Sequence, residues 1–311
     1  MLWTDHIRLD PAYRAALEAA GLARVPDVLA RVDGKVVAWS RTTETTHIPG
    51  LNGEPGFYLK RYFYPTWKKR VRGAFRGTFF GVHRGLAEFR ALRNMRALGI
   101  SAVRPVGYGT RRCGHFVTAC FLITEEVPAA CNLTTFAQRV AAGQVPLSPA
   151  DRWALIARLA EQVAGMHAAG FSHGQLFWRN VLLRTSLAGE PEFFFLDAQP
   201  RRWRQLRTTS KWWLYELAHL TVSALPFTRR SDRLRFLLHY SQVARLTPEL
   251  RDSARRVAAL TRHWQQHETQ RIKMNQLFDQ WNDQLERDAP PVTPAPDGAA
   301  ALSCSGAGTR P

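Results

Sequence analysis

The stretch from His173 to Asp197 constrains the fold of this chain more than any other. Asn180 follows His173 by seven residues and begins the apolar run 181–183, and Asp197 ends a second apolar run, 193–196, seventeen residues after Asn180. A Gly-Glu-Pro turn at 189–191 separates the two runs. The pattern predicts a loop, a short strand, a turn and a second strand that ends on a carboxylate. An amide oxygen and a carboxylate at the two ends of such a hairpin suit Mg²⁺ held against triphosphate oxygens.

The totals describe an ordinary globular chain in a reducing compartment. Its 311 residues suffice for one large or two modest domains. No run of 18 apolar residues is present, so no membrane span is expected, and the first ten residues lack the apolar core of a secretory signal. The four cysteines have no Cys-x-x-Cys spacing, which favours neither zinc nor a disulfide framework. We therefore expect a cytoplasmic protein.

The net charge of +18 indicates an anionic partner. Fourteen Lys and Arg face a single acid between residues 60 and 112, and a connector at 64–84 interleaves basic and aromatic residues. Such a connector can bind nucleic acid or lie beside anionic lipid. Because no nucleic-acid-binding motif is present, a nucleic-acid partner is the less favoured of the two. The residues that carry this hypothesis are Trp67, Lys68, Lys69, Arg70, Arg72, Phe75 and Arg76.

The N-terminal part predicts a sheet with one helix. Residues 1–31 are expected to be a helical extension, with the helix from about 5 to 31. The segments 36–39, 41–48, 57–62, 103–108 and 116–123 are predicted strands, because each is apolar or Thr-rich and most are bounded by turns. An apolar stripe predicts a helix over 84–98 that ends at Gly99. Together they form a lobe over 32–127, and the extended segment 124–128 leaves it.

Lys60 and Glu88 are the candidate charged pair of this lobe. Strand alternation places Tyr58, Lys60 and Tyr62 on one face. Glu88 is the only acid of its helix and lies on the packed side. Glu88 could anchor Lys60 across the interface between strand and helix, or it could pair with the arginines of its own helix. Lys60 could equally be a solvated strand lysine.

The C-terminal part, 128–288, is predicted to be mainly helical. Ser148 is a helix cap, followed by Pro149 and a helical repeat that Gly170 ends. Further helices are expected over 210–225, 229–244 and 247–288. Residues 289–311 are rich in Pro, Gly, Ala and Ser and are predicted to be a disordered tail.

This order of parts resembles a protein-kinase-like fold, and more closely the bacterial lipopolysaccharide core kinases, which phosphorylate heptose or 3-deoxy-manno-octulosonic acid (Kdo). The resemblance runs from about Val36 to about Leu225. It rests on the segments 58–67, 88–100 and 123–126, on His173-Gly174 with 179–182, and on Leu196-Asp197. It implies an α+β, bilobal fold in which an N-terminal antiparallel sheet with one helix precedes a mainly helical lobe.

The resemblance also implies roles for the residues at these positions. Lys60 would hold the α and β phosphates of ATP and be oriented by Glu88. The backbone of 123–127, with Glu125 and Val127, would receive the adenine.

In the C-terminal lobe, Asn180 and Asp197 would bind Mg²⁺ and His173 would fix the catalytic loop. Glu216 stands near the position of a helical Asp that braces this loop in the family. The implied acceptor is a lipid-linked sugar at the anionic inner face of the inner membrane.

Three departures from the family pattern bear on activity. Gln175 occupies the position of the catalytic Asp, and Asp197-Ala198-Gln199 replaces Asp-Phe-Gly. No Gly-x-Gly-x-x-Gly covers the phosphates, and Thr42–Thr46 is a poor substitute. The first hypothesis is an ATP-dependent sugar-lipid kinase in which Gln175 orients the acceptor hydroxyl. The second is a pseudokinase that binds nucleotide or lipid and regulates envelope assembly without catalysis.

Overall fold

The computed structural model describes residues 3–40, 42–51, 53–64, 82–185, 190–199 and 212–288. The chain divides into two compact units, Met1–Thr269 and Gln270–Pro311. The elements discussed below belong to the first unit, and the described residues of the second continue the last helix. The basic and aromatic residues expected to face an anionic surface, from Trp67 to Arg76, lie outside the described residues, as does the tail 289–311.

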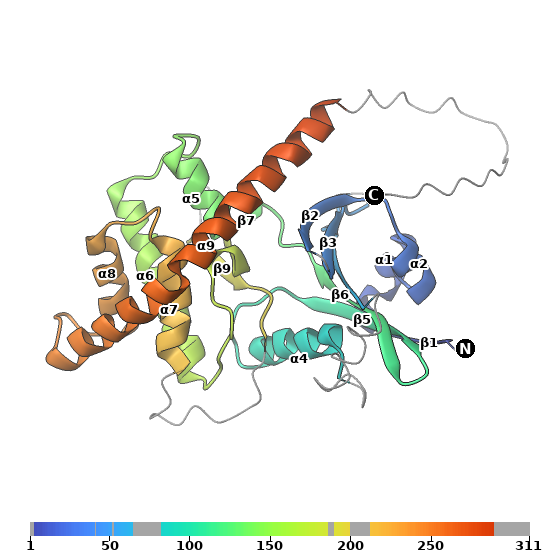
Figure 1. Ribbon diagram of the computed structural model, residues 1–311, viewed down its shortest axis with the longest axis horizontal. Coiled ribbons are helices and arrows are strands. Elements are labelled where there is room, and N and C mark those ends of the chain that lie inside the picture. Colours follow the sequence, from blue (N-terminus) through green and yellow to red (C-terminus); the bar gives the residue numbers. More distant parts are fainter. Residues whose placement is uncertain are drawn as a thin grey trace. The chain divides into compact units, whose positions relative to one another are not determined.

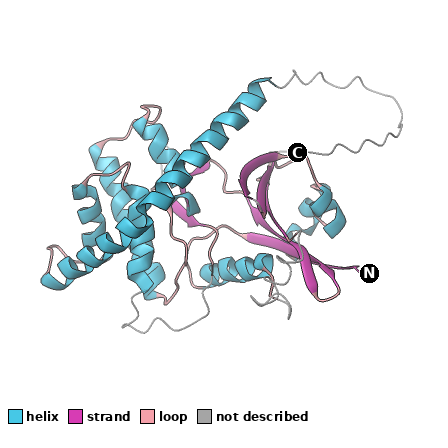
Figure 2. Ribbon diagram, viewed as in Figure 1, coloured by secondary structure: helices cyan, strands magenta, loops and turns pink. Residues whose placement is uncertain are grey.

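Six strands form one antiparallel sheet in the order β1-β5-β6-β4-β3-β2 (Figures 1 and 2). They are β1 (Trp3–Leu9), β2 (Lys35–Ser40), β3 (Thr43–Ile48), β4 (Phe57–Phe63), β5 (Pro105–Cys113) and β6 (Phe116–Glu125). The five strands predicted from the sequence are present.

Side-chain alternation along β4 gives the sheet two different faces. Phe57 and Leu59 pack in one apolar cluster with the short helices α1 (Arg14–Ala19) and α2 (Val25–Ala30). Lys60 and Tyr62 project from the opposite face, where both contact Glu88 of α4 (Arg84–Ala97). Figure 1 shows α4 and the α1–α2 pair on opposite sides of the sheet. The alternation read from the sequence therefore places Lys60 correctly.

The helix predicted from residue 5 to 31 is wrong in its first part, because Trp3–Leu9 form strand β1. This strand pairs with β5 in a register that runs from Trp3 opposite Cys113 to Leu9 opposite Gly107. Most β1 side chains are exposed, as expected at a sheet edge, so no apolar alternation marks the strand in the sequence. Only a partner about a hundred residues away makes it a strand. The later part does form helices, α1 and α2, as expected.

Helix α4 begins at a buried histidine cap. The Nδ1 atom of His83 accepts a hydrogen bond of 3.2 Å from the backbone N–H of Leu86. Burial lowers the pKa of His83 to about 3, so the ring stays neutral and keeps this nitrogen free to accept. The helix is followed by Gly99, whose φ of +74° is the left-handed conformation predicted for its stop.

The rest of the chain is mainly helical, as predicted. The helices are α5 (Leu133–Ala141), α6 (Pro149–Ala168), α7 (Trp212–Ala224), α8 (Arg230–Tyr240) and α9 (Pro248–Asp288). This part also contains a small sheet of three strands, β7 (Ala130–Asn132), β8 (Val181–Arg184) and β9 (Glu192–Phe195). Ser148 caps α6 by accepting from the N–H of Asp151, and Thr247 caps α9 in the same way, as expected. Among the described helices, none has the length and apolar character needed to cross a membrane.

One apolar core runs from α4 into the helical part. Phe89, Leu92 and Met95 of α4 belong to the same buried cluster as Phe193 and Phe195 of β9. Phe195 also exchanges backbone hydrogen bonds with Ser101 and Val103, each 3.0 Å long. The end of β9, and with it Asp197, is therefore held against the segment that connects α4 to the large sheet.

Candidate active site

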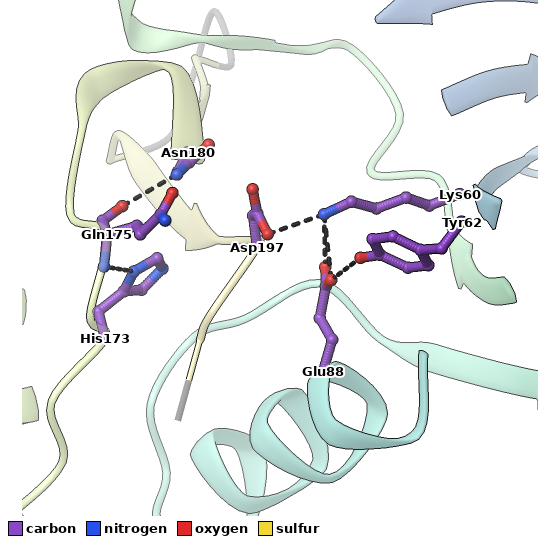
Figure 3. A network of polar contacts seen from close by, with 7 residues as sticks. All are labelled: Lys60, Tyr62, Glu88, His173, Gln175, Asn180 and Asp197. Carbon is purple, nitrogen blue, oxygen red and sulfur yellow. Dashed lines mark hydrogen bonds and ion pairs between the residues drawn. The ribbon is translucent and has the colours of Figure 1, made fainter. Parts of the chain in front are cut away.

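Two carboxylates from distant parts of the chain, Glu88 and Asp197, meet around the amino group of Lys60 (Figure 3). The Nζ atom of Lys60 lies 3.1 Å and 3.0 Å from the two carboxylate oxygens of Glu88, and 2.8 Å from Oδ1 of Asp197. The predicted pair between Lys60 and Glu88 is present, and Glu88 pairs across to β4 rather than with the arginines of its own helix. Asp197 thus completes a chain of charges between the two lobes.

Burial and charge keep Lys60 positively charged. Burial alone would lower the pKa of Lys60, but the carboxylates of Glu88 and Asp197 outweigh it and hold the pKa above its usual 10.5. Burial raises the pKa of Glu88, against the opposing effect of Lys60. The hydroxyl of Tyr62 donates a further hydrogen bond to Glu88. This arrangement presents a fixed cation beside a carboxylate, which is the arrangement needed to hold an anionic phosphate chain.

Asp197 sits on a backbone turn that Gly174 makes possible. Asp197 has a φ of +55°, in the left-handed region that Asp tolerates better than most residues. Next to it, the N–H of Gln199 donates to the carbonyl of His173 at 3.0 Å. Gly174 has a φ of +82°, and a Cβ there would lie 2.4 Å from the carbonyl oxygen of Gln199. Any other residue at 174 would force the loop and the Asp197 segment apart.

The loop from His173 to Asn180 folds back on itself through Gln175. The backbone carbonyl of Gln175 accepts from the side-chain amide of Asn180 at 2.9 Å and from the N–H of Phe177 at 2.8 Å. The N–H of Gln175 donates to Nδ1 of His173, whose ring is fully buried. Burial lowers the pKa of His173, so the ring is neutral. Figure 3 shows the half-buried side chain of Gln175 extending from this loop towards Asp197.

Glu216 of α7 supports the start of this loop through hydrogen bonds to its carboxylate. Its carboxylate accepts from the backbone N–H groups of His173 and Gly174, and from the hydroxyl of Ser172 at 3.0 Å. The Nε2 atom of His167 lies 2.9 Å from it. Although Glu is one methylene longer than Asp, the contacts expected of a bracing carboxylate are present. Burial would raise the pKa of Glu216, but His167 and the loop N–H outweigh it and keep the pKa below its usual 4.5.

Replacing Glu216 with glutamine is expected to lower the free energy of unfolding by about 3 kcal/mol at pH 7, because a neutral amide replaces a buried carboxylate with several donors. The contribution of a carboxyl with a lowered pKa is present above its unfolded value near 4.5 and is lost as the pH falls through the folded pKa. The difference between wild type and variant should therefore shrink below pH 4.5. Urea unfolding at pH 7 and at decreasing pH measures it.

Glu161→Gln is the matched control, because this glutamate is 54% exposed and pairs only loosely with Arg158 at 3.8 Å. An equal loss of stability in both variants, or a Glu216→Gln deficit that does not change with pH, would contradict the bracing role.

The hydrogen bonds of the segment expected to receive adenine leave the backbone N–H of Val127 available. The N–H of Glu125 donates to the carbonyl of Arg104 at 2.9 Å, and that of Glu126 donates to Gly56 at 2.8 Å. The carbonyl of Val127 accepts from Ala130, whereas its N–H has no hydrogen-bond partner among the described residues. Val127 can therefore donate to a ring nitrogen, and Glu125 can contribute only its carbonyl or side chain.

The residues present fit a magnesium ion. The side-chain nitrogen of Asn180 is engaged by Gln175, which leaves its oxygen as the group available to a cation. Asp197 contributes a second hard oxygen donor, and a backbone hydrogen bond of 3.1 Å from Leu196 to Asn180 keeps the two segments adjacent. One amide oxygen and one carboxylate, completed by phosphate oxygens, are ligands typical of Mg²⁺.

The structure brings together Lys60, Glu88, Asp197, Asn180, Gln175 and His173, and it adds residues that sequence reasoning did not single out. Tyr62 could have been found, because alternation already placed it beside Lys60. His167 could not, because only the packing of helices distant in the chain brings it to the carboxylate of Glu216. Among the described residues no phosphate-covering loop is identified: Thr42 lies in a turn and Thr43–Thr46 lie within strand β3.

Comparison with protein families gives a consistent result. The model of the lipopolysaccharide kinase (Kdo/WaaP) family matches residues 27–240. The chain is 30% identical over 220 residues to lipopolysaccharide core heptose(I) kinase WaaP of Pseudomonas aeruginosa, covering 60% of this chain and 77% of that protein. It is 25% identical over 171 residues to 3-deoxy-D-manno-octulosonic acid kinase of Pasteurella multocida, covering 55% and 65%.

A solved structure resembles this one over most of its length. The structure of WaaP in complex with acyl carrier protein aligns with a TM-score of 0.57 at 25% identity, covering 86% of this chain and 99% of that chain. The fold is therefore the bilobal, protein-kinase-like fold expected from the sequence, with an N-terminal antiparallel sheet and a helical C-terminal part.

Proposed function

The chain belongs to the lipopolysaccharide kinase (Kdo/WaaP) family, and from that premise we propose that it transfers the γ-phosphoryl group of ATP to a Kdo or heptose hydroxyl of a lipid-linked saccharide. Members of this family are phosphotransferases that act on sugar hydroxyls in lipopolysaccharide biosynthesis. The observation that carries the proposal is the chain of charges from Glu88 through Lys60 to Asp197. It connects the two lobes at the place where a triphosphate would lie.

Each side chain has a task in this proposal. Lys60 neutralises the α and β phosphates, and Glu88 with Tyr62 fixes its amino group. The N–H of Val127 donates to the adenine ring. Because the transition state of phosphoryl transfer is loose, positioning and charge neutralisation supply most of the rate.

Asn180 and Asp197 would hold Mg²⁺, which supplies charge neutralisation at the β and γ phosphates when it is bound. In this proposal Asp197 has a second role, as the carboxylate that keeps Lys60 close to the nucleotide. The side-chain nitrogen of Asn180 donates to the carbonyl of Gln175, so the side-chain oxygen of Asn180 points away from that carbonyl.

Gln175 orients the acceptor hydroxyl rather than deprotonating it. Its side-chain oxygen can accept a hydrogen bond from a sugar hydroxyl, and the proton leaves late, to solvent or to the transferred phosphoryl group. A general base typically contributes about 10²–10⁴-fold, less than the whole constellation, so slower transfer remains feasible without one.

A pseudokinase is the second candidate function, and Gln175 is the observation that favours it. Such a protein would bind nucleotide or lipid and regulate envelope assembly without transfer. Purified protein with Mg²⁺ and ATP, offered a panel of Kdo- and heptose-containing lipids, separates the two candidates. An added phosphate detected by mass supports the kinase, whereas metal-dependent ATP binding without transfer to any acceptor supports the pseudokinase.

We place the protein at the cytoplasmic, anionic face of the inner membrane, where ATP and the growing lipid meet. The support is the net charge and the basic run between residues 60 and 112. Binding to phosphatidylglycerol vesicles should fall about tenfold when salt rises from about 0.05 M to about 0.5 M, because the screening length of exposed charges falls from more than ~10 Å to less than ~8 Å. Flotation or sedimentation of vesicles measures it, with phosphatidylcholine vesicles as the neutral reference.

Lys68→Gln, Lys69→Gln and Arg70→Gln together should weaken this binding. The matched control removes the same charge elsewhere, through Arg251→Gln, Arg255→Gln and Arg262→Gln on exposed positions of α9. Equal losses in both triple variants would assign the effect to net charge rather than to the connector. Equal binding to both lipids would remove the membrane proposal.

A further inference from the structure

A buried ion pair joins the catalytic loop to helix α9. Nη1 of Arg179 lies 2.5 Å and 2.6 Å from the two carboxylate oxygens of Glu268, and the hydroxyl of Ser223 is 3.3 Å from one of them. Glu268 is only 4% exposed. A carboxylate so deeply buried is retained only if its charge is compensated, and Arg179 supplies that compensation. The pair links residues 89 positions apart in the sequence.

Ring contacts reinforce the same connection. The guanidinium of Arg179 lies 4.0 Å from the ring centre of Phe177, and that ring stacks on His219 of α7 at 4.4 Å. His219 in turn meets the edge of Trp264 at 5.1 Å. Trp264 and Glu268 are four residues apart and so share one face of α9. That face contacts the loop and its supporting helix through both a charge and an aromatic ring.

The contact reaches the residues that face the nucleotide. Arg179 directly precedes Asn180, and Phe177 donates its N–H to the carbonyl of Gln175, which also holds the Asn180 side chain. Consecutive Cα atoms are ~3.8 Å apart, so a shift of Arg179 is transmitted directly to Asn180. Helix α9 begins at Pro248, beyond the family match, which ends at residue 240. The contact therefore comes from a part of the chain outside the matched region.

We propose that Glu268 is a positioning residue, through which α9 fixes the catalytic loop so that Asn180 and Gln175 face the nucleotide and the acceptor. Glu268 touches neither substrate nor metal and acts through Arg179. The catalytic consequence and the effect on metal-dependent nucleotide binding rest on the proposed function, but the effect on the loop does not.

Glu268→Gln tests the proposal, because glutamine keeps the shape and removes the charge. Hydrogen exchange of the full chain should become about tenfold faster in peptides covering 173–181, and unchanged in those covering β4, if only the loop opens locally. The affinity for ADP should fall about tenfold in the presence of Mg²⁺ and stay unchanged with EDTA, because a loop displaced by ~1 Å misplaces Asn180. Transfer, where it is measurable, should fall, and the KM for ATP should rise together with the dissociation constant of ADP.

Asp252→Asn is the matched control on the same helix. Asp252 is 53% exposed and pairs with Arg256 at 2.8 Å within α9, so its loss should change none of these quantities. Unchanged loop exchange and unchanged Mg²⁺-dependent ADP affinity in Glu268→Gln would overturn the proposal. Equally increased exchange throughout the molecule would also overturn it, because it would make the ion pair a support of overall stability alone.

Arg179→Lys provides a second variant if Glu268→Gln does not fold. Lysine keeps the positive charge opposite Glu268 but loses the planar contact with Phe177. Arg179→Lys should show the same selective increase in loop exchange and the same loss of ADP affinity. The fold-loss in the double variant with Glu268→Gln should be smaller than the product of the two single fold-losses. Independent effects would contradict the link. A wild type that transfers phosphate to no acceptor would remove the proposed function, and the exchange measurement would still decide the role of Glu268 in fixing the loop.

Discussion

Replacing Asp197 with asparagine is expected to lower phosphoryl transfer by about 10³-fold or more. The substitution removes a carboxylate that would hold the metal, and such charge stabilisation is worth several kcal/mol, with about 1.4 kcal/mol for each factor of ten. It also removes one of the two carboxylates around the amino group of Lys60, 2.8 Å away. The pKa of Lys60 should then fall, because burial would be opposed by Glu88 alone.

The measurement is the rate of phosphate transfer from ATP at saturating Mg²⁺, together with metal-dependent nucleotide affinity. Circular dichroism and thermal unfolding show whether Asp197→Asn keeps the fold. Glu161→Gln, which also neutralises one acid but on an exposed helix position, should transfer at the wild-type rate. A rate within about threefold of wild type in Asp197→Asn would mean that another group holds the metal, and the site assignment would fail.

Replacing Gln175 with aspartate is expected to raise transfer by up to about 10²-fold, because it restores a general base worth about 10²–10⁴-fold. The shorter side chain can misplace the carboxylate by about 1 Å, which can cost on the order of 10²-fold, so the net gain depends on loop geometry. The backbone contacts of residue 175 with Asn180 and His173 do not involve its side chain and should survive. Initial rates across pH measure the change, because a new base should also introduce a new titration into the profile.

Gln175→Asn is the control for this variant, since asparagine has the length of aspartate without its charge. If the proposal is right, Gln175→Asn transfers more slowly than wild type and Gln175→Asp at least as fast. A wild type that is inert beside an active Gln175→Asp would identify the chain as a lapsed kinase and favour the pseudokinase. Wild-type transfer that does not change in any of these variants would show that residue 175 does not face the acceptor.

Local patterns in the sequence were sufficient for the elements that carry the site. Alternation along 57–63 placed Lys60 and Tyr62 on the face that meets α4, and an apolar stripe with one acid placed Glu88 on the packed side of that helix. The hairpin of β8 and β9, with Asn180 at its start, follows from two short apolar runs. These features depend on residues within a few positions of one another, so a single sequence contains their physical cause.

The tertiary structure alone decided which partners those elements find. Strand β1 has mostly exposed side chains and becomes a strand because β5 pairs with it across a hundred residues. The bond from Lys60 to Asp197 spans 137 positions, and Arg179 and Glu268 are 89 apart. A local hydrophobic pattern does not predict contacts between residues so far apart in the sequence, because these contacts depend on how the buried surfaces of separate elements fit together. The sequence by itself therefore determined the parts of this site and their order, whereas packing between distant helices determined that the carboxylates of Glu216 and Glu268 contact the loop from Ser172 to Asn180.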